Sequence, residues 1–310
     1  MEFKHIPVLL DEVIEGLNIK REGIYVDCTM GGGGHSSEIA ARLSEGGKLI
    51  GFDRDIDAVK VCRERFKDNK NIEIIHANFK DAPHILNGRG VLGIDGILVD
   101  LGVSSYQIDN GSRGFSFLHE GRLDMRMDKS QAKDAYMVVN SYPKERLIDI
   151  LYKYGEESNA KRIVENICQR RAISPIETTT QLKDIIEQSF PKKVIYGKGG
   201  VSKKTFQAIR IEVNGELDGL DEFLREGIKM LNKGGRLAVI TFHSLEDRIV
   251  KNIFKEYATD CICPPKTPVC ICGHKAEIKL INHKPIIADK SELLENSRSS
   301  SAKLRVIEKL

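Results

Sequence analysis

The regular alternation of short apolar runs with helix-like stretches, beginning at residue 24, constrains the fold more than any other feature. The runs IYVDC, KLIGFD and IEIIHA are separated by two stretches of helical character, which is the β-α-β-α-β pattern of a parallel sheet. A fourth run, GILVDL at residues 96–101, stays apolar until Asp100, as in a strand covered on both faces. Later runs, RLAVITF and AKLRVIEK, supply two further strands, the last of which should close the sheet edge. The sequence therefore predicts a doubly wound α/β fold.

A long insertion interrupts this pattern after the fourth strand. The RLAVITF strand begins at Arg236, 136 residues after Asp100, whereas a βαβ unit needs only about 30 residues. The intervening stretches have helical periodicity, with Thr178 as a candidate N-cap. We therefore expect an inserted all-helical domain over residues 110–214 and a discontinuous α/β domain formed by residues 1–109 and 215–310.

Composition excludes several classes of protein. With 41% hydrophobic and 30% charged residues, the chain is typical of a folded globular protein. It shows no signal-peptide core and no apolar stretch of the roughly 20 residues that span a bilayer. We therefore expect a soluble, cytoplasmic protein. The net charge of +3 permits an anionic partner without requiring one.

A glycine-rich turn, DCTMGGGGHS at residues 27–36, follows the first strand and opens a helix. Glycines let backbone N–H groups approach a ligand, and a helix N-terminus favours an anionic group. Gly31 and Gly33 match a G-x-G-x-x-G template whose third position is here Ser36, so a tight turn without a ligand is the alternative. Asp53 ends the second strand 22 residues after Gly31, at the spacing where a carboxylate meets ribose hydroxyls.

The acid before the glycines favours one ligand over another. Asp27 would repel a pyrophosphate but could pair with the amino group of a methionine moiety, which favours S-adenosylmethionine over a nicotinamide dinucleotide. Phe79, after the third strand, could offer an apolar face to adenine or pack in the core. The rival interpretations are a nicotinamide-dependent oxidoreductase, which would bind NAD, and a non-catalytic RNA-binding factor, in which the glycine turn is structural.

Polar groups also follow the fourth and fifth strands. Asp100 lies at the carboxyl end of a strand, where open α/β sheets bind ligands, with a helix N-cap as its structural alternative. Hydrogen-bonding side chains crowd the loop after it: Ser104, Ser105 and Gln107. After the fifth strand, His243 is a weak acid/base candidate, and Ser244 is either an N-cap or a substrate contact.

A basic segment, residues 188–211, carries six basic residues and no acidic residue. The basic residues are Lys192, Lys193, Lys198, Lys203, Lys204 and Arg210. Glycines at 197, 199 and 200 add flexibility, so the segment is interpreted as a mobile loop suited to phosphate contacts, with an idle solvated loop as the alternative. The absence of acids favours RNA as the partner.

The seven cysteines fall into two groups. Cys28, Cys62 and Cys168 lie within apolar patterns and are expected to be reduced, buried thiols. The segment CICPPKTPVCICGH gathers soft-metal ligands at Cys261, Cys263, Cys270, Cys272 and His274. Four thiolates could bind zinc. The Cys-x-Cys spacing is tighter than the usual two-residue gap, however, which favours a reduced loop without metal.

Taken in order, these motifs resemble the MraW (RsmH) family of bacterial methyltransferases, which modify cytidine N4 in 16S rRNA. The shared motifs run nearly end to end: HIPVLL (5–10), DCTMGGGGHS, GFDRD (51–55), DLGVSSYQID, RGFSF (113–117), RLDMRMD (122–128), YGEE (154–157), FQAIRIEVNGEL (206–217) and FHSLEDR (242–248). The C-terminal NSRSSSAKLR departs from the family pattern at Ser297 and Ser300. The resemblance implies a Rossmann-like class I methyltransferase sheet with a large inserted helical domain. It also implies S-adenosylmethionine as methyl donor and a decoding-centre (P-site) cytidine of the small ribosomal subunit as substrate.

The resemblance also assigns site residues. The donor would contact Gly33, Gly34, His35, Asp53, Phe79, Asp100 and Gln107, and the insertion would help to recognise the rRNA. Cytosine N4 is a poor nucleophile because its lone pair is delocalised, so the enzyme must align it and accept a hydrogen bond from it. The candidate acceptors are Asp100, Ser104 and Ser105. The candidate substrate-positioning residues are Asp124, Arg126, Lys203, Lys204, Asn214, His243 and Ser244.

Overall fold

The computed structural model describes residues 7–195, 200–264, 267 and 269–310, and the chain forms two compact units. Unit 1 comprises residues 1–102 and 218–310, and unit 2 comprises residues 103–217. The sequence placed the corresponding boundaries at 109/110 and 214/215. Among the described helices, none is long and apolar enough to cross a membrane.

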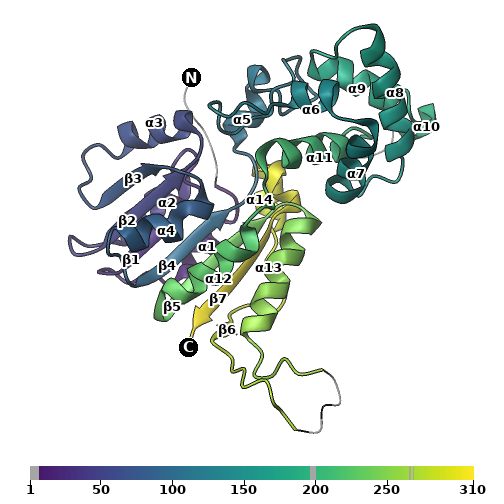
Figure 1. Cartoon of the computed structure of the whole chain (residues 1–310). Coiled ribbons are helices and arrows are strands. Elements are labelled where there is room, and N and C mark those ends of the chain that lie inside the picture. Colours follow the sequence, from purple (N-terminus) through teal and green to yellow (C-terminus); the bar gives the residue numbers. More distant parts are fainter. Residues whose placement is uncertain (1–6, 196–199, 265–266, 268) are drawn as a thin grey trace. The chain divides into compact units, whose positions relative to one another are not determined.

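Unit 1 is built on a seven-stranded sheet in the order β3-β2-β1-β4-β5-β7-β6 (Figure 1). The strands are β1 Ile24–Asp27, β2 Lys48–Asp53, β3 Ile72–His76, β4 Ile94–Asp100, β5 Leu231–Thr241, β6 Ile278–Leu280 and β7 Lys303–Lys309. Strands β1 to β5 are parallel, and β7 is antiparallel to both β5 and β6. The strand order reverses beside β1, which is the switch point where such sheets bind ligands.

The strands that the sequence predicted are confirmed, but the expected sheet edge is wrong. AKLRVIEK forms β7, yet it is not the edge strand, because β6 pairs along its outer side. The sequence pattern did not indicate β6, which has only three residues. Strand β5 also begins at Leu231, ahead of the RLAVITF run.

Helices cover both faces of the sheet (Figure 1). Alternate residues of a strand point to opposite faces: Ile97 and Val99 of β4 join the core that contains α4 (Ala82–Gly88), α12 (Leu220–Met230) and α13 (Ser244–Tyr257). Leu98 joins the core on the other face, with α1 (Leu10–Leu17) and α2 (Gly34–Arg42). The double coverage explains why β4 is almost continuously apolar. The remaining elements of unit 1 are α3 (Ile56–Arg65), η1 (Phe79–Asp81), α14 (Lys290–Glu295) and η3 (Ser297–Ser301).

Unit 2 is mainly helical. Its elements are α5 (Ser105–Asp109), η2 (Gly111–Arg113), α6 (Ala135–Ser141), α7 (Lys144–Gly155), α8 (Ala160–Ile173), α9 (Thr179–Glu187), α10 (Lys192–Ile195) and α11 (Lys203–Asn214). Helix α7 packs against α8 and α11 around buried side chains such as Ile150, Ile163 and Ile209. The Thr178 hydroxyl accepts a hydrogen bond from Gln181 N, which confirms the predicted N-cap of α9.

Burial was expected for three cysteines and is found for two of them. Cys28 and Cys62 are buried, as predicted. Cys168, on α8, is only partly buried, so its expected burial is wrong. The amphipathic face of α8 is filled instead by Ile163, Val164 and Ile167.

The double coverage of the sheet gives a test of stability. Leu98→Ala should lower the free energy of unfolding by about 2 to 5 kcal/mol, because Leu98 is 1% exposed and its loss leaves a cavity. Leu92→Ala is the matched control: Leu92 is 86% exposed, so the change should stay within about 0.5 kcal/mol. Urea unfolding followed by circular dichroism measures both. Equal effects would contradict the placement of β4 between two helical layers.

Candidate active site

Three carboxylates mark one edge of the sheet in unit 1. Asp27, Asp53 and Asp100 are the last residues of β1, β2 and β4. Because these strands are parallel neighbours, their carboxyl ends meet at the same edge. The turns that follow β1 and β2, together with Asp100, form the candidate site of unit 1.

The glycine turn between β1 and α2 is fixed by hydrogen bonds to β2. Met30 N donates to Phe52 O at 3.0 Å, and Gly31 N donates to Asp53 Oδ2 at 2.8 Å. Gly31 and Gly33 have φ values of +52° and +79°, which favour glycine. A Cβ atom on Gly31 would meet nothing within 4 Å, so the backbone here borders open space. That combination suits a turn that a ligand approaches closely.

The carboxylate of Asp27 already accepts hydrogen bonds from neighbouring residues. It accepts them from Ser36 Oγ at 2.5 Å and from Thr29 N at 3.1 Å. Burial raises the pKa of Asp27 to about 6, although both hydrogen bonds act to lower it. The contacts join the start of α2 to the end of β1, so Asp27 holds the glycine turn in place.

Asp53 combines structural contacts with spare acceptor capacity. It accepts hydrogen bonds from Gly31 N and, at 2.7 Å, from Asp55 N. Burial raises its pKa to about 6, against the lowering effect of these two hydrogen bonds. Because a carboxylate has about four lone-pair sites, two donors leave Asp53 able to accept more.

Asp100 is the most unusual group at this edge. Its Oδ1 atom is buried and has no hydrogen-bond partner among the residues that the structure describes. Its Oδ2 atom lies 4.0 Å from Nδ1 of His35, whose Nε2 is 3.0 Å from Val8 O. Burial, and then the charges of Asp27 and Glu246, raise the pKa of Asp100 well above its usual value. A buried carboxylate oxygen without a donor fits a site that a hydrogen-bond donor on a ligand completes.

Asp100 is not a helix cap. The N-cap of α5 is Ser104, whose hydroxyl accepts from Gln107 N at 3.3 Å while Gln107 Oε1 accepts from Ser104 N at 3.1 Å. Ser104, Ser105 and Gln107 all belong to unit 2. Ser104 and Gln107, two of the expected site residues, therefore have a structural role at the start of α5.

Phe79 lies in the hydrophobic core of unit 1. It is 8% exposed, and its ring meets Phe223 edge-to-face with centroids 5.1 Å apart. Core packing, one of the two roles expected for Phe79, is thus what the described contacts support.

The end of β5 is organised by a helix cap. His243 Nδ1 accepts from Glu246 N at 3.4 Å, and Glu246 Oε2 accepts from Phe242 N at 2.9 Å. His243 is therefore the N-cap of α13, and Ser244 is its first residue rather than the cap. The buried Glu246 was missed, although its position three residues after His243 is the spacing of a capping box.

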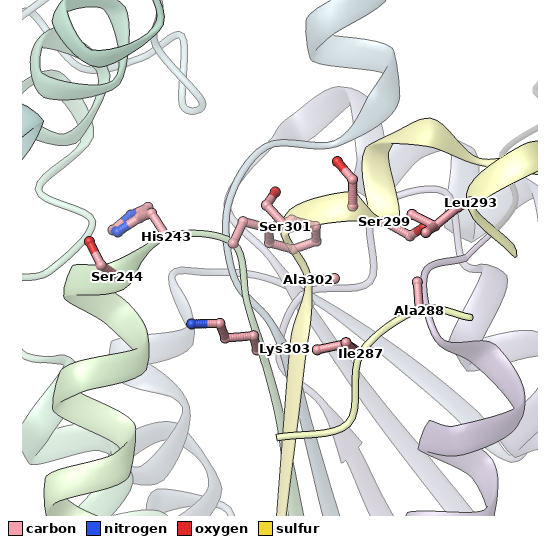
Figure 2. A pocket seen from close by; sticks show the side chains of 11 residues that line it. His243, Ser244, Ile287, Ala288, Leu293, Ser299, Ser301, Ala302 and Lys303 are labelled. Carbon is pink, nitrogen blue, oxygen red and sulfur yellow. The ribbon is translucent and has the colours of Figure 1, made fainter. Parts of the chain in front are cut away.

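A pocket of about 310 Å³ lies beside this cap (Figure 2). His243 and Ser244 line it from the start of α13, Ser299 and Ser301 from η3, and Lys303 from the start of β7. Residues of the segment NSRSSSAKLR and of the FHSLEDR motif therefore line the same pocket.

Two of the expected substrate-positioning residues of unit 2, Asp124 and Arg126, form an ion pair. Arg126 donates to both carboxylate oxygens of Asp124, at 2.8 and 2.7 Å. Partial burial raises the pKa of Asp124, but the hydrogen bonds from Arg126 outweigh it and hold the pKa below its usual value. Asn214 bonds Met127 N at 2.8 Å and Met125 O at 2.7 Å, so it fixes the loop that carries the Asp124–Arg126 pair.

The basic segment is not one mobile loop. Lys203, Lys204 and Arg210 lie on α11, and Lys192 and Lys193 lie on α10. Arg210 is paired with Glu216 through two hydrogen bonds of 2.8 Å, so its charge is neutralised. Lys203 and Lys204 are exposed on the first turn of α11. Lys198, like His5 of the HIPVLL motif, lies outside the described residues.

The sheet order and the glycine turn are those of a Rossmann-like methyltransferase that uses S-adenosylmethionine as methyl donor. The chain belongs to the MraW methylase family, whose model matches residues 2–310.

Relatives of full length support this assignment. The chain is 54% identical over 312 residues to the ribosomal RNA small subunit methyltransferase H of Finegoldia magna, and 53% identical over 310 residues to that of Clostridium botulinum, with both chains wholly covered.

Solved structures that align include a rRNA-methylase of Clostridium thermocellum (12% identity, 98% and 99% coverage, TM-score 0.44). Another is a methyltransferase of Streptococcus mutans in complex with SAH (13% identity, 98% and 99% coverage, TM-score 0.43).

The raised carboxyl pKa values predict how donor binding depends on pH. Asp27 and Asp53, with pKa values of about 6, are protonated below that pH and ionised above it. Because their folded pKa values exceed the unfolded ones, the stability that they contribute is present below about pH 4 and is lost as pH rises through 6. A bound cation favours the ionised forms, so affinity for S-adenosylmethionine should rise as pH increases from 5 to 7.

S-adenosylhomocysteine is the matched control, since it lacks the sulfonium charge. Its affinity should change less over the same pH range. Calorimetry in buffers of different ionisation enthalpy would also detect the protons released on binding. Equal pH dependence for the two ligands would contradict an electrostatic role for this edge.

Proposed function

We propose that this chain transfers a methyl group from S-adenosylmethionine to the exocyclic N4 of a decoding-centre (P-site) cytidine in 16S rRNA of the small ribosomal subunit. The names of the relatives, ribosomal RNA small subunit methyltransferase H, support the class of substrate. The observation that carries the chemistry is the buried Oδ1 atom of Asp100, at the carboxyl end of β4, without a partner among the described residues.

We assign binding of the methyl donor to the turn that follows β1 and to the adjacent carboxyl edge of the sheet. Open space over Gly31 lets the backbone approach the ligand, and the spare lone pairs of Asp53 can accept ribose hydroxyls. We include the start of α2, at Gly33, Gly34 and His35, in this site. Asp27 acts on the donor through the turn that it holds, because Ser36 and Thr29 already occupy its carboxylate.

For the reaction, we assign Asp100 as the group that accepts a hydrogen bond from the amino group of cytosine. S-adenosylmethionine supplies an electrophilic methyl group on a positively charged sulfur. Burial raises the pKa of Asp100, but its oxygens can accept a hydrogen bond in either protonation state, and the ionised form accepts most strongly. The carboxylate would orient the N4 lone pair, which attacks the methyl carbon as the bond from carbon to sulfur breaks and S-adenosylhomocysteine leaves. It would stabilise the positive charge that develops on N4 and then take the proton that N4 must lose, or pass it to water. Ser104 and Ser105 remain further candidates for this contact.

For the RNA, we assign exposed basic residues of unit 2. Lys203 and Lys204 on α11 suit phosphate contacts, and the Asp124–Arg126 pair, fixed by Asn214, offers a rigid hydrogen-bonding surface. His243 and Ser244 line the pocket after β5, on the unit that holds the donor. The target base must be unpaired or flipped out for a donor at this edge to reach it.

Replacing both lysines tests the RNA contact. Lys203→Ala with Lys204→Ala should weaken binding of 16S rRNA fragments and reduce the slope of log affinity against log salt by about 0.7 for each phosphate that the lysines no longer neutralise. Lys67→Ala with Lys70→Ala, two exposed lysines after α3, removes the same charge from unit 1. The control should change the slope less. An unaltered slope in the α11 variant would remove these lysines from the interface.

The reaction itself is tested with small ribosomal subunits and labelled donor. Mass spectrometry of the digested rRNA should find N4-methylcytidine at one decoding-centre position. Carbon-5 methylation ordinarily needs a cysteine nucleophile, and among the described residues none of the cysteines lies at the carboxyl end of β4 or β5. Detection of 5-methylcytidine or 2′-O-methylation alone would refute the proposal.

Asp100→Asn refines this test, since the amide keeps the shape of the side chain but loses its charge. Turnover should fall on the order of 100-fold, the scale for losing one electrostatic contact with the transition state, because the neutral amide can accept a hydrogen bond but cannot offset the positive charge on N4. Donor affinity should change little. The control Asp95→Asn alters a carboxyl on the same strand that pairs with Lys20 at 2.9 Å, and it should leave turnover nearly unchanged. A main effect on donor affinity would reassign Asp100 to donor binding.

A further inference from the structure

The connection between α13 and β6 gathers four cysteines at one point. The sulfur atoms of Cys261, Cys263, Cys270 and Cys272 all lie within 4.8 Å of one another. Residues 265–266 and 268, between the two cysteine pairs, lie outside the described part of the chain. All four cysteines are free thiols.

The sulfur separations match a single tetrahedral ion. Cys261 lies 3.4 Å from Cys270 and 3.8 Å from Cys272, while Cys270 lies 3.9 Å from Cys263 and 3.5 Å from Cys272. Four thiolates bound to zinc at about 2.3 Å stand about 3.8 Å apart along the edges of the tetrahedron. A disulfide would require about 2.05 Å. The cluster therefore has the dimensions of a metal site.

The Cys-x-Cys spacing, which favoured a loop without metal, is compatible with this geometry. In extended chain, the side chains on either side of a residue point away from that residue's own side chain. The intervening Ile262 and Ile271 are 53% and 86% exposed, as expected if both cysteines of each pair face inward. Burial of these two isoleucines therefore contributes little to the stability of the segment.

The two arms of the connection are aligned by hydrogen bonds. Glu277 N donates to Tyr257 O at 2.9 Å, and Ala276 N donates to Asp260 Oδ1 at 3.3 Å. His274 Nδ1 lies 2.8 Å from Thr259 O, so His274 ties the arms together rather than acting as a fifth ligand through that atom. These contacts hold each cysteine pair opposite the other.

We propose that Cys261, Cys263, Cys270 and Cys272 bind one Zn²⁺ ion in a structural site. Tetrahedral coordination by four sulfurs is typical of zinc or of iron–sulfur chemistry, and the short separations fit one ion rather than a cluster of several irons. Four protein ligands leave no open position for a substrate, so the ion stabilises the connection and takes no part in methyl transfer.

The site is remote from the candidate active site within unit 1. Helix α13 begins at the carboxyl end of β5, and the connection leaves from the other end of this helix (Figure 1). The zinc proposal is thus independent of the proposed function. Removal of the ion should leave the affinity for S-adenosylmethionine unchanged.

Elemental analysis and native mass spectrometry of the full-length protein, purified under reducing conditions, provide the test. The wild type should contain one zinc ion per chain, and cobalt substitution should give strong thiolate-to-cobalt charge-transfer absorption. Cys270→Ser with Cys272→Ser should abolish binding. Cys168→Ser, which removes a partly exposed thiol from α8, should retain the full content.

A measurement on the wild type keeps the proposal testable if the double variant does not fold. Hydrogen exchange of residues 258–264 and 269–277 should accelerate after treatment with a chelator and slow again when zinc is restored. Protein that lacks zinc and has four reactive thiols, protein with disulfides among these cysteines, and protein that contains iron would each overturn the proposal.

Discussion

The parallel pairing of β1 with β2 and β4 is the constraint on which the candidate site depends. It places the carboxylates of Asp27, Asp53 and Asp100 on one edge of the sheet, where burial opposes their ionisation. For Asp27 and Asp53, hydrogen bonds from the glycine turn and its neighbours offset part of the cost of burial. Asp100 Oδ1 has no such partner among the described residues. The edge is therefore arranged to receive a ligand that donates a hydrogen bond, which would recover part of the free energy lost when this carboxylate is buried.

The sheet could be predicted because its strands are buried on both faces. Ile97, Leu98 and Val99 contact helices on alternate sides, so the apolar run is continuous and easy to recognise. Strand β6 has three residues and only one of them is buried, which leaves too little pattern to detect. The strand ends were also predictable, since a carboxylate that interrupts an apolar run marks the carboxyl edge of a parallel sheet.

The partners of the polar residues could not be predicted. Asp124 and Arg126 are two residues apart, but their pairing depends on how the loop is bent, and Met125 between them has a positive φ of 58°. The sequence presents Arg210 as an available charge, but in the folded chain it pairs with Glu216. Similarly, the cysteine spacing alone did not reveal that two Cys-x-Cys pairs face each other. Each of these contacts is set by the folded backbone, which sequence spacing describes poorly.

Unit 2 is inserted in the chain between β4 and β5, and this connectivity has a consequence for the rate of folding. Strands β4 and β5 are hydrogen-bonded neighbours, yet the whole of residues 103–217 separates them along the chain. Closing so long a loop is entropically costly, and non-local pairings of this kind slow folding. Within unit 2, α8 contacts its neighbours in sequence, α7 and α9, and α11 packs back against α7 and α6, so these helices can pack together without the sheet. If the insertion folds first, its compact form shortens the loop that must close between β4 and β5, and the pairing of these strands is then less costly.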